Sequence, residues 1–416
     1  MRFQFNIVKQ RKCRLCNSDL EHVILDLGPT PLSNSFLKTK SEKEFVFPLK
    51  VYFCINCFLV QIPEYENPEK IFSNYPYFSS YSETWLEHCK NYVNMVIEKF
   101  GFDKNNLVVE IASNDGYLLQ FFKKANIKIL GIEPAFNIAK IAEEKGIPTI
   151  TKFFGEDLAK KLVNEGKKAD LVIGNNVLAH VPNLNDFISG LNILTPTNGI
   201  ITLEFPHLLK LLQNNQFDTI YHEHFSYFSL LTVKKIFDYH DLKIFEVDEL
   251  STHGGSLRLF VTHNENNDVD EHPSVRLILD KEKKFGLDKL DTYTNFPKKI
   301  FCIKKDLTNF LEKAKNNSQS VVCYGAPAKG NTLLNFCKIS NKLIQYTVDK
   351  STQKQKMFLP GNHIPIYQPD MIKKTKPDYI LILPWNLKDE IMEEVKYVRE
   401  WGGKFVIPIP EVKILN

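Results

Sequence analysis

From Leu107 onward, short apolar runs alternate with amphipathic stretches along the chain. The apolar runs are rich in β-branched residues, and the stretches between them carry apolar side chains at helical spacing. This alternation predicts a parallel sheet that helices cover on both faces, with antiparallel strands at its end. The predicted parallel strands are 107–112, 128–134, 149–154, 170–177 and 199–206, and the predicted antiparallel strands are 243–250 and 257–264.

A second, smaller α/β unit is predicted near the C-terminus. At 320–336 an apolar run meets a glycine-containing turn and then a helical pattern. Two more strand candidates follow at 343–350 and 379–385. A Lys-rich stretch with helical spacing, at about 275–315, separates this unit from the acidic, polar break at 264–272. We therefore expect two α/β units, of which the first is the larger.

The first 75 residues follow neither pattern. They combine a Pro-, Ser- and Asn-rich stretch with short apolar runs, which is too little apolar material for a good core. Small modules of this kind are usually stabilised by cross-links, for example by a bound metal ion. The aromatic segment 75–85 comes next, and the apolar spacing at 86–100 predicts a helix.

Composition and charge agree with a folded protein of several domains. At about 150 residues per domain, 416 residues indicate two or three domains, and 43% hydrophobic residues exclude whole-chain disorder. A net charge of +4 is too small for a dominant nucleic-acid-binding surface. No apolar run approaches the about 20 residues that span a bilayer, and no signal-peptide core is present. We expect a cytoplasmic protein without nucleic-acid or membrane partners.

Two C-x-x-C pairs lie in the N-terminal segment. Cys13 with Cys16, and Cys54 with Cys57, can each supply a tight knuckle to one tetrahedral zinc ion. Redox-active dithiols and ordinary core cysteines are the alternatives. Because four ligands leave no position open for substrate or water, this zinc would be structural. The other four cysteines are scattered, which is typical of buried, inert thiols.

A candidate cofactor site follows the first predicted strand, where 110–116 runs through small and polar residues toward a helix. Glu133 ends the next strand, at the interval of about 20 residues at which an acid meets ribose hydroxyls in such folds. One glycine in place of three disfavours a dinucleotide and favours S-adenosylmethionine, although any strand-to-helix turn can look similar. The predicted cofactor contacts are Glu110, Ala112, Asn114, Asp115, Gly116, Glu133, Pro134, Asn175 and Asn176.

The densest group of titratable side chains is the segment 221–229, which holds two histidines, two tyrosines and a glutamate. In an extended strand His222 and His224 would share one face, whereas in a turn this alternation is lost. A metal site and a solvated loop compete with the interpretation that we favour, acid–base catalysis next to a carbonyl group. His180, after the fourth predicted strand, would face the same crevice, and a structural role for it is about equally plausible.

Two glycine-containing turns are candidate sites for the phosphate groups of a substrate. The segment 252–258 joins a Gly-Gly turn to an arginine suited to oxyanions, although that arginine could be merely solvated. The segment 325–331 precedes a helix N-terminus, a natural anion site, but lacks P-loop spacing. We therefore favour a substrate phosphate over a second nucleotide cofactor. The predicted contacts are Ser256, Arg258, Gly325, Lys329 and Asn331.

Together these motifs resemble a known family: the zinc-containing, S-adenosylmethionine-dependent C-3 methyltransferases of nucleotide-linked 4-keto deoxysugars. The resemblance spans nearly the whole chain and lies in the C-x-x-C pairs, YPYFSSYS, EIASNDGYLL, NNVLAHV, YHEHFSYFS, THGGSLR and YGAPAKGNTLLN. It implies a zinc-binding module over 1–75 and a class I methyltransferase domain over 76–300. It also implies a Rossmann-like domain over 301–416 that helps to enclose the sugar nucleotide.

The resemblance also implies roles for single residues. It assigns zinc to the four paired cysteines and the cofactor to Glu110, Asn114, Gly116, Glu133 and Asn176. The residues implied in catalysis are Tyr221, Glu223, His224, His180 and Tyr75. Tyr77 is a further candidate substrate contact, whereas Phe78 stands where a tyrosine is expected, so a hydroxyl contact is absent there.

The implied reaction begins with removal of the proton at C3 of the sugar, which the C4 carbonyl acidifies, and the enolate then attacks the sulfonium methyl. We expect His224 to be the base, with Tyr221 as its close competitor and Glu223 orienting it. His180 or Tyr75 would stabilise the enolate oxygen. The alternatives are an O- or N-methyltransferase of a small metabolite, a zinc-ribbon binding protein with an inactive methyltransferase domain, and a less favoured zinc-containing NAD oxidoreductase.

Overall fold

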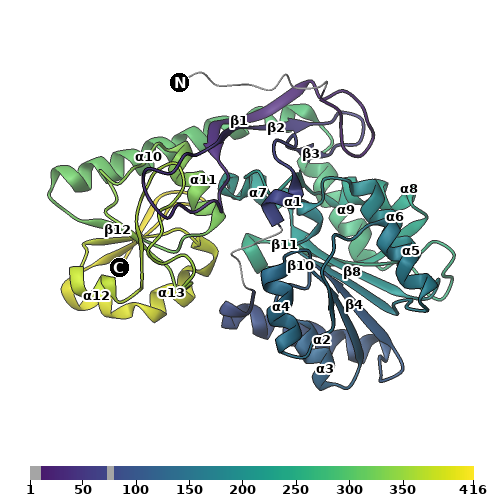
Figure 1. Ribbon diagram of the computed structural model, residues 1–416. Helices are drawn as coiled ribbons and strands as arrows, with labels where there is room; N and C mark the ends of the chain where they lie inside the picture. The colour runs from purple at the N-terminus through teal and green to yellow at the C-terminus, as the bar shows by residue number, and fades with distance from the viewer. Residues whose placement is uncertain (1–10, 73–78) are drawn as a thin grey trace.

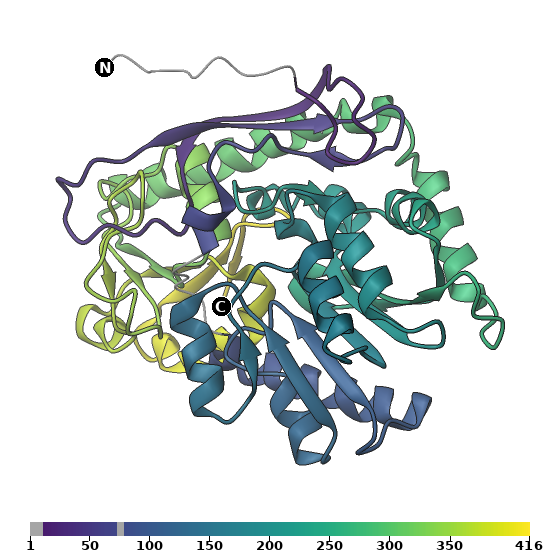
Figure 2. The same ribbon diagram turned by 45° about the vertical axis from the view of Figure 1, so that its right-hand side comes forward.

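The computed structural model describes residues 11–72 and 79–416, which form three β-sheets (Figure 1). Tyr75, Tyr77 and Phe78 therefore lie outside the described residues. A large central sheet and a smaller C-terminal sheet belong to two α/β units, and the N-terminal strands lie across one end of both (Figures 1 and 2). Over the described ranges, no helix combines the length and apolar character needed to span a membrane.

The central sheet, as described, has seven strands, and β11 runs opposite in direction to the other six. Both the parallel core and the antiparallel end confirm the prediction from the apolar runs. The strands follow across the sheet in the order β6 (Thr149–Ile150), β5 (Lys128–Ile132), β4 (Leu107–Ile111), β7 (Leu171–Asn175), β8 (Ile200–Pro206), β11 (Ser256–His263) and β10 (Leu242–Leu250).

Helices cover both faces of the central sheet. Successive side chains of a strand point to opposite faces, so a continuous apolar run makes both faces apolar and both must be covered. Val108 packs into one core and its neighbour Val109 into the other. The first core is completed by α2 (Glu83–Phe100), α3 (Leu119–Lys124) and α4 (Phe136–Glu144). The second is completed by α5 (Glu156–Asn164), α6 (Leu184–Leu194), α8 (Leu230–Tyr239) and α9 (Pro273–Phe285).

The C-terminal unit has a six-stranded sheet in which only the edge strand β17 is antiparallel to its neighbour. The strand order is β14 (Ile366–Tyr367), β13 (Thr347–Val348), β12 (Val321–Tyr324), β15 (Tyr379–Ile382), β16 (Lys404–Ile407) and β17 (Lys413–Leu415). The helices of this unit are α10 (Phe296–Asn316), α11 (Ala328–Phe336), α12 (Met371–Thr375) and α13 (Lys388–Glu394), with 3-10 turns η6 (Trp385–Leu387) and η7 (Lys396–Trp401). The second α/β unit is thus confirmed.

The predicted helix at 275–315 is in fact two helices. Gly286 ends α9 with a φ of +89°, and its N–H bonds to the carbonyl oxygen of Glu282 at 3.0 Å. A left-handed residue of this kind closes a helix, and glycine adopts it without steric cost. After the 3-10 turn η5 (Leu290–Tyr293), α10 leaves the central unit and packs against β1 (His22–Pro31).

A strand from the histidine segment completes the N-terminal sheet. The order of this sheet is β1, β2 (Val46–Phe53), β3 (Val60–Gln61) and β9 (Ser226–Tyr227). Before β9 the chain forms a turn, in which the N–H of His224 bonds to the carbonyl oxygen of Tyr221 at 2.9 Å. Of the two conformations that the sequence left open, the turn is present, so His222 and His224 do not share a strand face.

A buried carboxylate fastens α9 to α8. Glu282 accepts the N–H groups of Leu230 and Leu231, the first residues of α8, at 2.7 and 2.8 Å. Nε2 of His207, which follows β8, lies 2.6 Å from the same carboxylate. The first amides of a helix lack intrahelical partners and favour negative charge, so Glu282 caps α8 from a neighbouring helix.

We expect Glu282→Ala to lower the free energy of unfolding by about 3 kcal/mol, because it leaves buried amides and an imidazole without their shared partner. Differential scanning calorimetry measures the change as a fall in Tm. Glu271→Ala, at an exposed position before the same helix, is the control. A Tm of Glu282→Ala equal to that of the control would contradict the capping role.

Candidate functional site

A cavity of about 760 Å³ lies between the central sheet and the C-terminal unit. Asn114, Glu133 and Asn175 line it from the carboxyl ends of β4, β5 and β7. Gly325 lines it from the turn after β12, and Lys329 from the first turn of α11. Parallel α/β sheets bind ligands at this edge. Two turns that lie far apart in the sequence therefore face one cavity.

The turn after β4 has a backbone shaped for close approach. Ala112 and Asn114 have φ values of +55° and +48°, and Gly116 has +75°. A Cβ on Gly116 would lie 2.1 Å from Cδ1 of Ile147, so only glycine fits there. Glu133 braces the turn, because its Oε2 accepts the N–H of Asn114 at 3.0 Å.

Glu133 and Asn175 present polar groups at the cavity wall, and Pro134 and Asn176 line the cavity beside them. Burial raises the pKa of Glu133 to about 7, and its hydrogen bonds to backbone N–H groups oppose this rise. Both side-chain polar atoms of Asn175 are buried and have no hydrogen-bond partner within residues 11–72 and 79–416. Buried polar groups are nearly always hydrogen-bonded, so a polar ligand in the cavity would satisfy this amide.

Glu110 and Asp115 are placed differently from the prediction, since neither side chain lines the cavity. Glu110 is fully buried within the sheet, and burial raises its pKa well above the ordinary value. Oδ2 of Asp115 lies 3.0 Å from Nζ of Lys145 and also accepts the hydroxyl of Ser80. Asp115 therefore supports the turn from behind, through Ser80 and the lysine that follows α4, whereas Glu110 lies buried within the sheet.

Tyr221 and His224 form a hydrogen-bonded pair on the cavity wall. Oη of Tyr221 lies 2.7 Å from Nε2 of His224, and the carbonyl oxygen of Thr219 lies 2.9 Å from Nδ1. A carbonyl oxygen can only accept, so Nδ1 carries the proton and Nε2 accepts the tyrosine hydroxyl. Burial lowers the pKa of His224 well below its usual range, and His180 acts in the same direction. At neutral pH the imidazole is therefore uncharged, with Nε2 as its basic atom.

His180 stands edge-on to this pair, at the end of η2 (Leu178–His180), and lines the same cavity. The ring centroids of His180 and His224 are 4.6 Å apart. Burial lowers the pKa of His180 to about 4, opposed by a hydrogen bond to the main chain of Glu223. Its Nδ1 is buried and finds no partner in the part of the chain that the structure describes. The neutral imidazole rings of His180 and His224 are therefore in contact in the cavity wall.

Glu223 does not orient His224, contrary to the expectation. Its two oxygens accept Nδ2 of Asn34 at 2.9 and 2.7 Å, and its side chain is not part of the cavity lining. His222 points into the N-terminal module, where Nε2 lies 3.2 Å from the carbonyl oxygen of Pro48. The turn explains both placements, because it sends neighbouring side chains in different directions.

Lys329 places a cation in the C-terminal wall of the cavity. Its ammonium group donates to Oδ1 of Asn386 and lies 4.6 Å from the ring centroid of Trp385. Nε1 of Trp385 donates to Oδ2 of Asp218 at 2.7 Å. Burial lowers the pKa of Lys329, whereas the charge of Asp218 raises it. The nearby carboxylate therefore helps this buried lysine to remain charged.

Of the remaining predicted substrate contacts, Gly325 lines the cavity, with a φ of +89°. Asn331 and Ser256 do not line it. Nδ2 of Asn331 donates to the carbonyl oxygen of Ser33 at 2.6 Å, and the hydroxyl of Ser256 donates to the carbonyl oxygen of Thr252 at 3.0 Å. Both side chains hold neighbouring segments together instead of facing a ligand.

Arg258 lies in a buried ion pair and not on the cavity wall. One of its terminal nitrogens is 3.0 Å from Oε2 of Glu204, and the guanidinium carbon is 4.6 Å from the ring centroid of Tyr92. Arg258 and Glu204 are directly paired residues of β11 and β8. The prediction of a phosphate contact at Arg258 is therefore withdrawn, because the sheet register supplies a buried carboxylate that the local motif does not show.

Sequence reasoning missed three notable residues of the lining, Trp85, His253 and Lys354. Nε2 of His253 lies 3.3 Å from Nδ2 of Asn176, and its ring centroid is 5.4 Å from that of Trp85. Nζ of Lys354 donates to a backbone carbonyl at 3.0 Å. His253 lies within the 252–258 motif and Trp85 ends the aromatic segment 75–85, so a signal was present for both, whereas Lys354 has an unremarkable local sequence.

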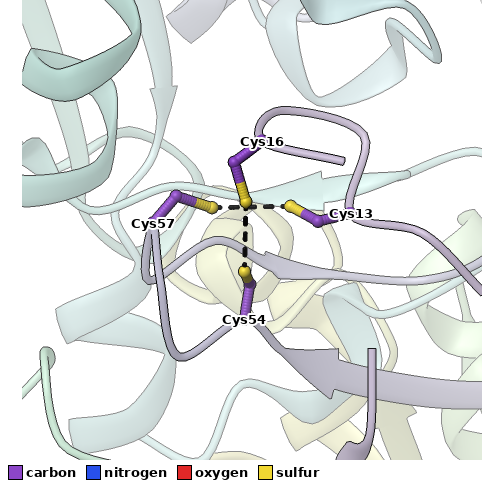
Figure 3. Close-up of side chains that lie close together, drawn as sticks. All are labelled: Cys13, Cys16, Cys54 and Cys57. Atoms are coloured by element: carbon purple, nitrogen blue, oxygen red, sulfur yellow. Dashed lines mark hydrogen bonds between the residues drawn. The ribbon is translucent and has the colours of Figure 1, made fainter. Parts of the chain in front are cut away.

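The four paired cysteines converge at one point of the N-terminal module, with one knuckle from each pair (Figure 3). Their sulfur atoms all lie within 4.8 Å of one another, with distances of 3.4 Å for Cys13–Cys57 and 3.5 Å for Cys16–Cys54. A tetrahedral site with Zn–S bonds of about 2.3 Å separates its sulfurs by about 3.8 Å. The cluster therefore fits a closed, structural zinc site.

Family models match three consecutive parts of the chain. Residues 13–72 match the "Putative zinc binding domain" model, 85–247 the "Methyltransferase domain" model and 251–410 the "C-methyltransferase C-terminal domain" model. The chain is 33% identical over 407 residues to the C-methyltransferase NovU of Streptomyces niveus, a match that covers 97% of each chain.

Solved structures show more distant likeness. The magnesium protoporphyrin IX methyltransferase ChlM of Synechocystis PCC 6803, solved with bound SAM, is 18% identical, with a TM-score of 0.33 over 43% of this chain and 79% of its own. The PH0226 protein of Pyrococcus horikoshii OT3 is 14% identical, with a TM-score of 0.38 over 48% of this chain and 99% of its own.

The purified chain is expected to hold about one zinc ion, and Cys16→Ser to lose most of it and to melt at a lower temperature, because it removes one of four thiolate ligands. Elemental analysis and calorimetry measure the two effects. Cys302→Ser, at an exposed cysteine outside the cluster, is the matched control. Full zinc content in Cys16→Ser would contradict the four-cysteine site.

Proposed function

The chain belongs to the C-methyltransferase family that includes NovU, and on this premise we propose that it methylates C3 of a nucleotide-linked 4-keto deoxysugar. Its central unit is a class I methyltransferase domain, which uses S-adenosylmethionine. Methylation at carbon requires a carbon nucleophile, and removal of a proton next to a carbonyl group generates one. The observation that carries the proposal is the neutral Tyr221–His224 pair in a cavity between two α/β units.

S-adenosylmethionine, when bound, supplies the electrophilic methyl group of its sulfonium centre. The residues after β4, β5 and β7 fit such a ligand. Glu133 would accept ribose hydroxyls, and the unpartnered amide of Asn175 would bind a polar atom of the cofactor. The positive φ angles of Ala112 and Asn114 leave the backbone accessible to it.

Tyr221 and His224 would act as one proton-accepting unit. The tyrosine hydroxyl already donates to Nε2, so its oxygen is able to take the C3 proton while Nε2 takes the proton of the hydroxyl. The carbonyl oxygen of Thr219 then faces the Nδ1–H of a positively charged ring and stabilises it. The two candidate bases that the sequence suggested are thus joined in one relay that ends on His224.

Negative charge develops on the C4 oxygen as the proton leaves, and a donor in the same wall would stabilise it. We assign this role to His180. In the tautomer that carries its proton on the buried Nδ1, which lacks a partner among the residues that are described, the ring gives up its hydrogen bond to the main chain of Glu223 and donates to the C4 oxygen. Tyr75, outside those residues, is the alternative. Lys329, with the Gly325 turn, would bind the diphosphate, and the neighbouring lining residue Lys354 adds a second cation.

Incubation with S-adenosylmethionine and a panel of nucleotide-linked 4-keto sugars tests the substrate class. The expected product gains one methylene in mass and shows a C–CH3 signal by NMR. We expect His224→Asn to lower turnover by about 100-fold or more and to abolish exchange of the C3 proton with deuterated solvent, because the proton acceptor is lost.

His222→Asn is the control for this variant, because His222 is also a buried histidine of the same segment but contacts Pro48 of the N-terminal module and not the cavity. Cofactor binding, measured by calorimetry, should stay unchanged in both variants. A methoxy or methylamine product would refute methylation at carbon, and full turnover of His224→Asn would refute the assignment of the base.

Replacing Asn175 by leucine should weaken cofactor binding without lowering the stability of the free protein. The variant removes two buried polar atoms that lack partners in the described chain, so its Tm without ligand should not fall. Its dissociation constant for S-adenosylmethionine should rise by about 10-fold, the value of one hydrogen bond to a charged or polar ligand group. Asn192→Leu, on α6 outside the cavity, is the control for calorimetric titration. Equal affinities in the two variants would contradict the role of Asn175.

A further inference from the structure

One arginine of the zinc module reaches the wall of the cavity. Arg14 lies between Cys13 and Cys16 in the first knuckle. One terminal nitrogen donates to the carbonyl oxygen of Pro182 at 2.9 Å, and the other donates to that of Ile62 at 2.5 Å. Pro182 is 168 positions away in the sequence, lines the cavity and follows His180 by two residues.

The same guanidinium also covers the residue after His224. Its carbon lies 5.2 Å from the ring centroid of Phe225, a cation–π contact. The N–H of Phe225 bonds to the carbonyl oxygen of Ala179 at 2.7 Å, and its carbonyl oxygen accepts the N–H of Ile62 at 3.0 Å. Arg14 therefore sits where the segments that carry His180 and His224 meet the end of β3.

The other side of Arg14 is tied to the cysteine cluster. Oε1 of Gln61 accepts the backbone N–H of Arg14 at 3.0 Å, and Nε2 of Gln61 donates to the sulfur of Cys13 at 3.0 Å. Contacts to metal ligands from the surrounding shell fix the orientation of a site.

We propose that Arg14 is a positioning residue through which the zinc knuckle sets the placement of His180 and His224. The proposal rests on the proposed function, in which these two histidines act on the substrate. A planar guanidinium can bind two carbonyl groups and stack on a ring at the same time, which a lysine ammonium cannot do. The zinc site then serves catalysis as well as the folding of its own module, although it lies outside the cavity.

Two substitutions of Arg14 and one control test this role. Arg14→Gln removes both the positive charge and the planar guanidinium with its two terminal donors. Arg14→Lys keeps the positive charge but removes the guanidinium. Arg11→Gln is the control, because Arg11 belongs to the same module, stacks on Tyr52 at 5.0 Å and is not part of the cavity lining. Zinc content and Tm establish for each variant that the module is intact.

The first readout needs no substrate. In protein labelled with 15N-histidine, with the signals assigned from His180→Asn and His224→Asn, both Arg14 variants should shift the imidazole resonances of His180 and His224. Arg11→Gln should leave them in place. The second readout is kinetic: kcat and the C3 exchange rate should fall by about 10-fold or more in Arg14→Gln and less in Arg14→Lys, with the KM for S-adenosylmethionine within about 2-fold of wild type.

Unchanged histidine resonances, or a kcat of Arg14→Gln within about 2-fold of wild type, would overturn the proposal. If Arg14→Gln loses zinc, Arg14→Lys decides by the same criteria. Loss of zinc by both variants, with Arg11→Gln intact, would show that Arg14 only maintains the fold and would also overturn it. A wild-type protein that neither exchanges nor methylates any sugar would refute the proposed function, and the resonance shifts would then decide the role of Arg14 alone.

Discussion

The segment 217–228 is hydrogen-bonded to all three parts of the protein, and the geometry of the cavity depends on this shared attachment. The C-terminal unit holds it through Trp385, which donates to Asp218, and through the hydroxyl of Thr332, which donates to the carbonyl oxygen of Ile220 at 3.0 Å. The N-terminal module holds it through the pairing of β9 with β3. A segment that is fixed from three sides keeps its reactive side chains in one arrangement before any ligand arrives.

The electrostatic character of the cavity follows from its burial. The pKa values of His180 and His253 are lowered to about 4, and that of His224 is lowered well below its usual range. The histidines around the cavity are thus uncharged at neutral pH, and the ammonium group of Lys329, whose pKa burial lowers and Asp218 raises, lies in the opposite wall. A cavity with neutral bases and a nearby lysine suits a reaction that creates negative charge on its substrate.

Features that depend on near neighbours in the chain could be predicted from the sequence. The alternation of strands and helices, the spacing of the cysteines and the position of Glu133 after its strand are of this kind. Features set by pairing between distant segments could not be predicted. Arg258 meets Glu204 because of the register of β11 on β8, and Glu223 meets Asn34 because a turn points it toward another module. Local motifs show that such side chains could bind a ligand or transfer a proton, but they do not show which distant residues pair with them.

The pairing of β9 with β3 also bears on how this protein can be rearranged in evolution. The methyltransferase match, 85–247, contains β9, whereas the strand that pairs with it belongs to the zinc-binding match, 13–72. A methyltransferase domain transferred alone would carry an unpaired strand edge and a reactive segment without its support. The three parts look separable in the sequence, yet recombination between relatives can preserve the cavity only when it moves them as one block.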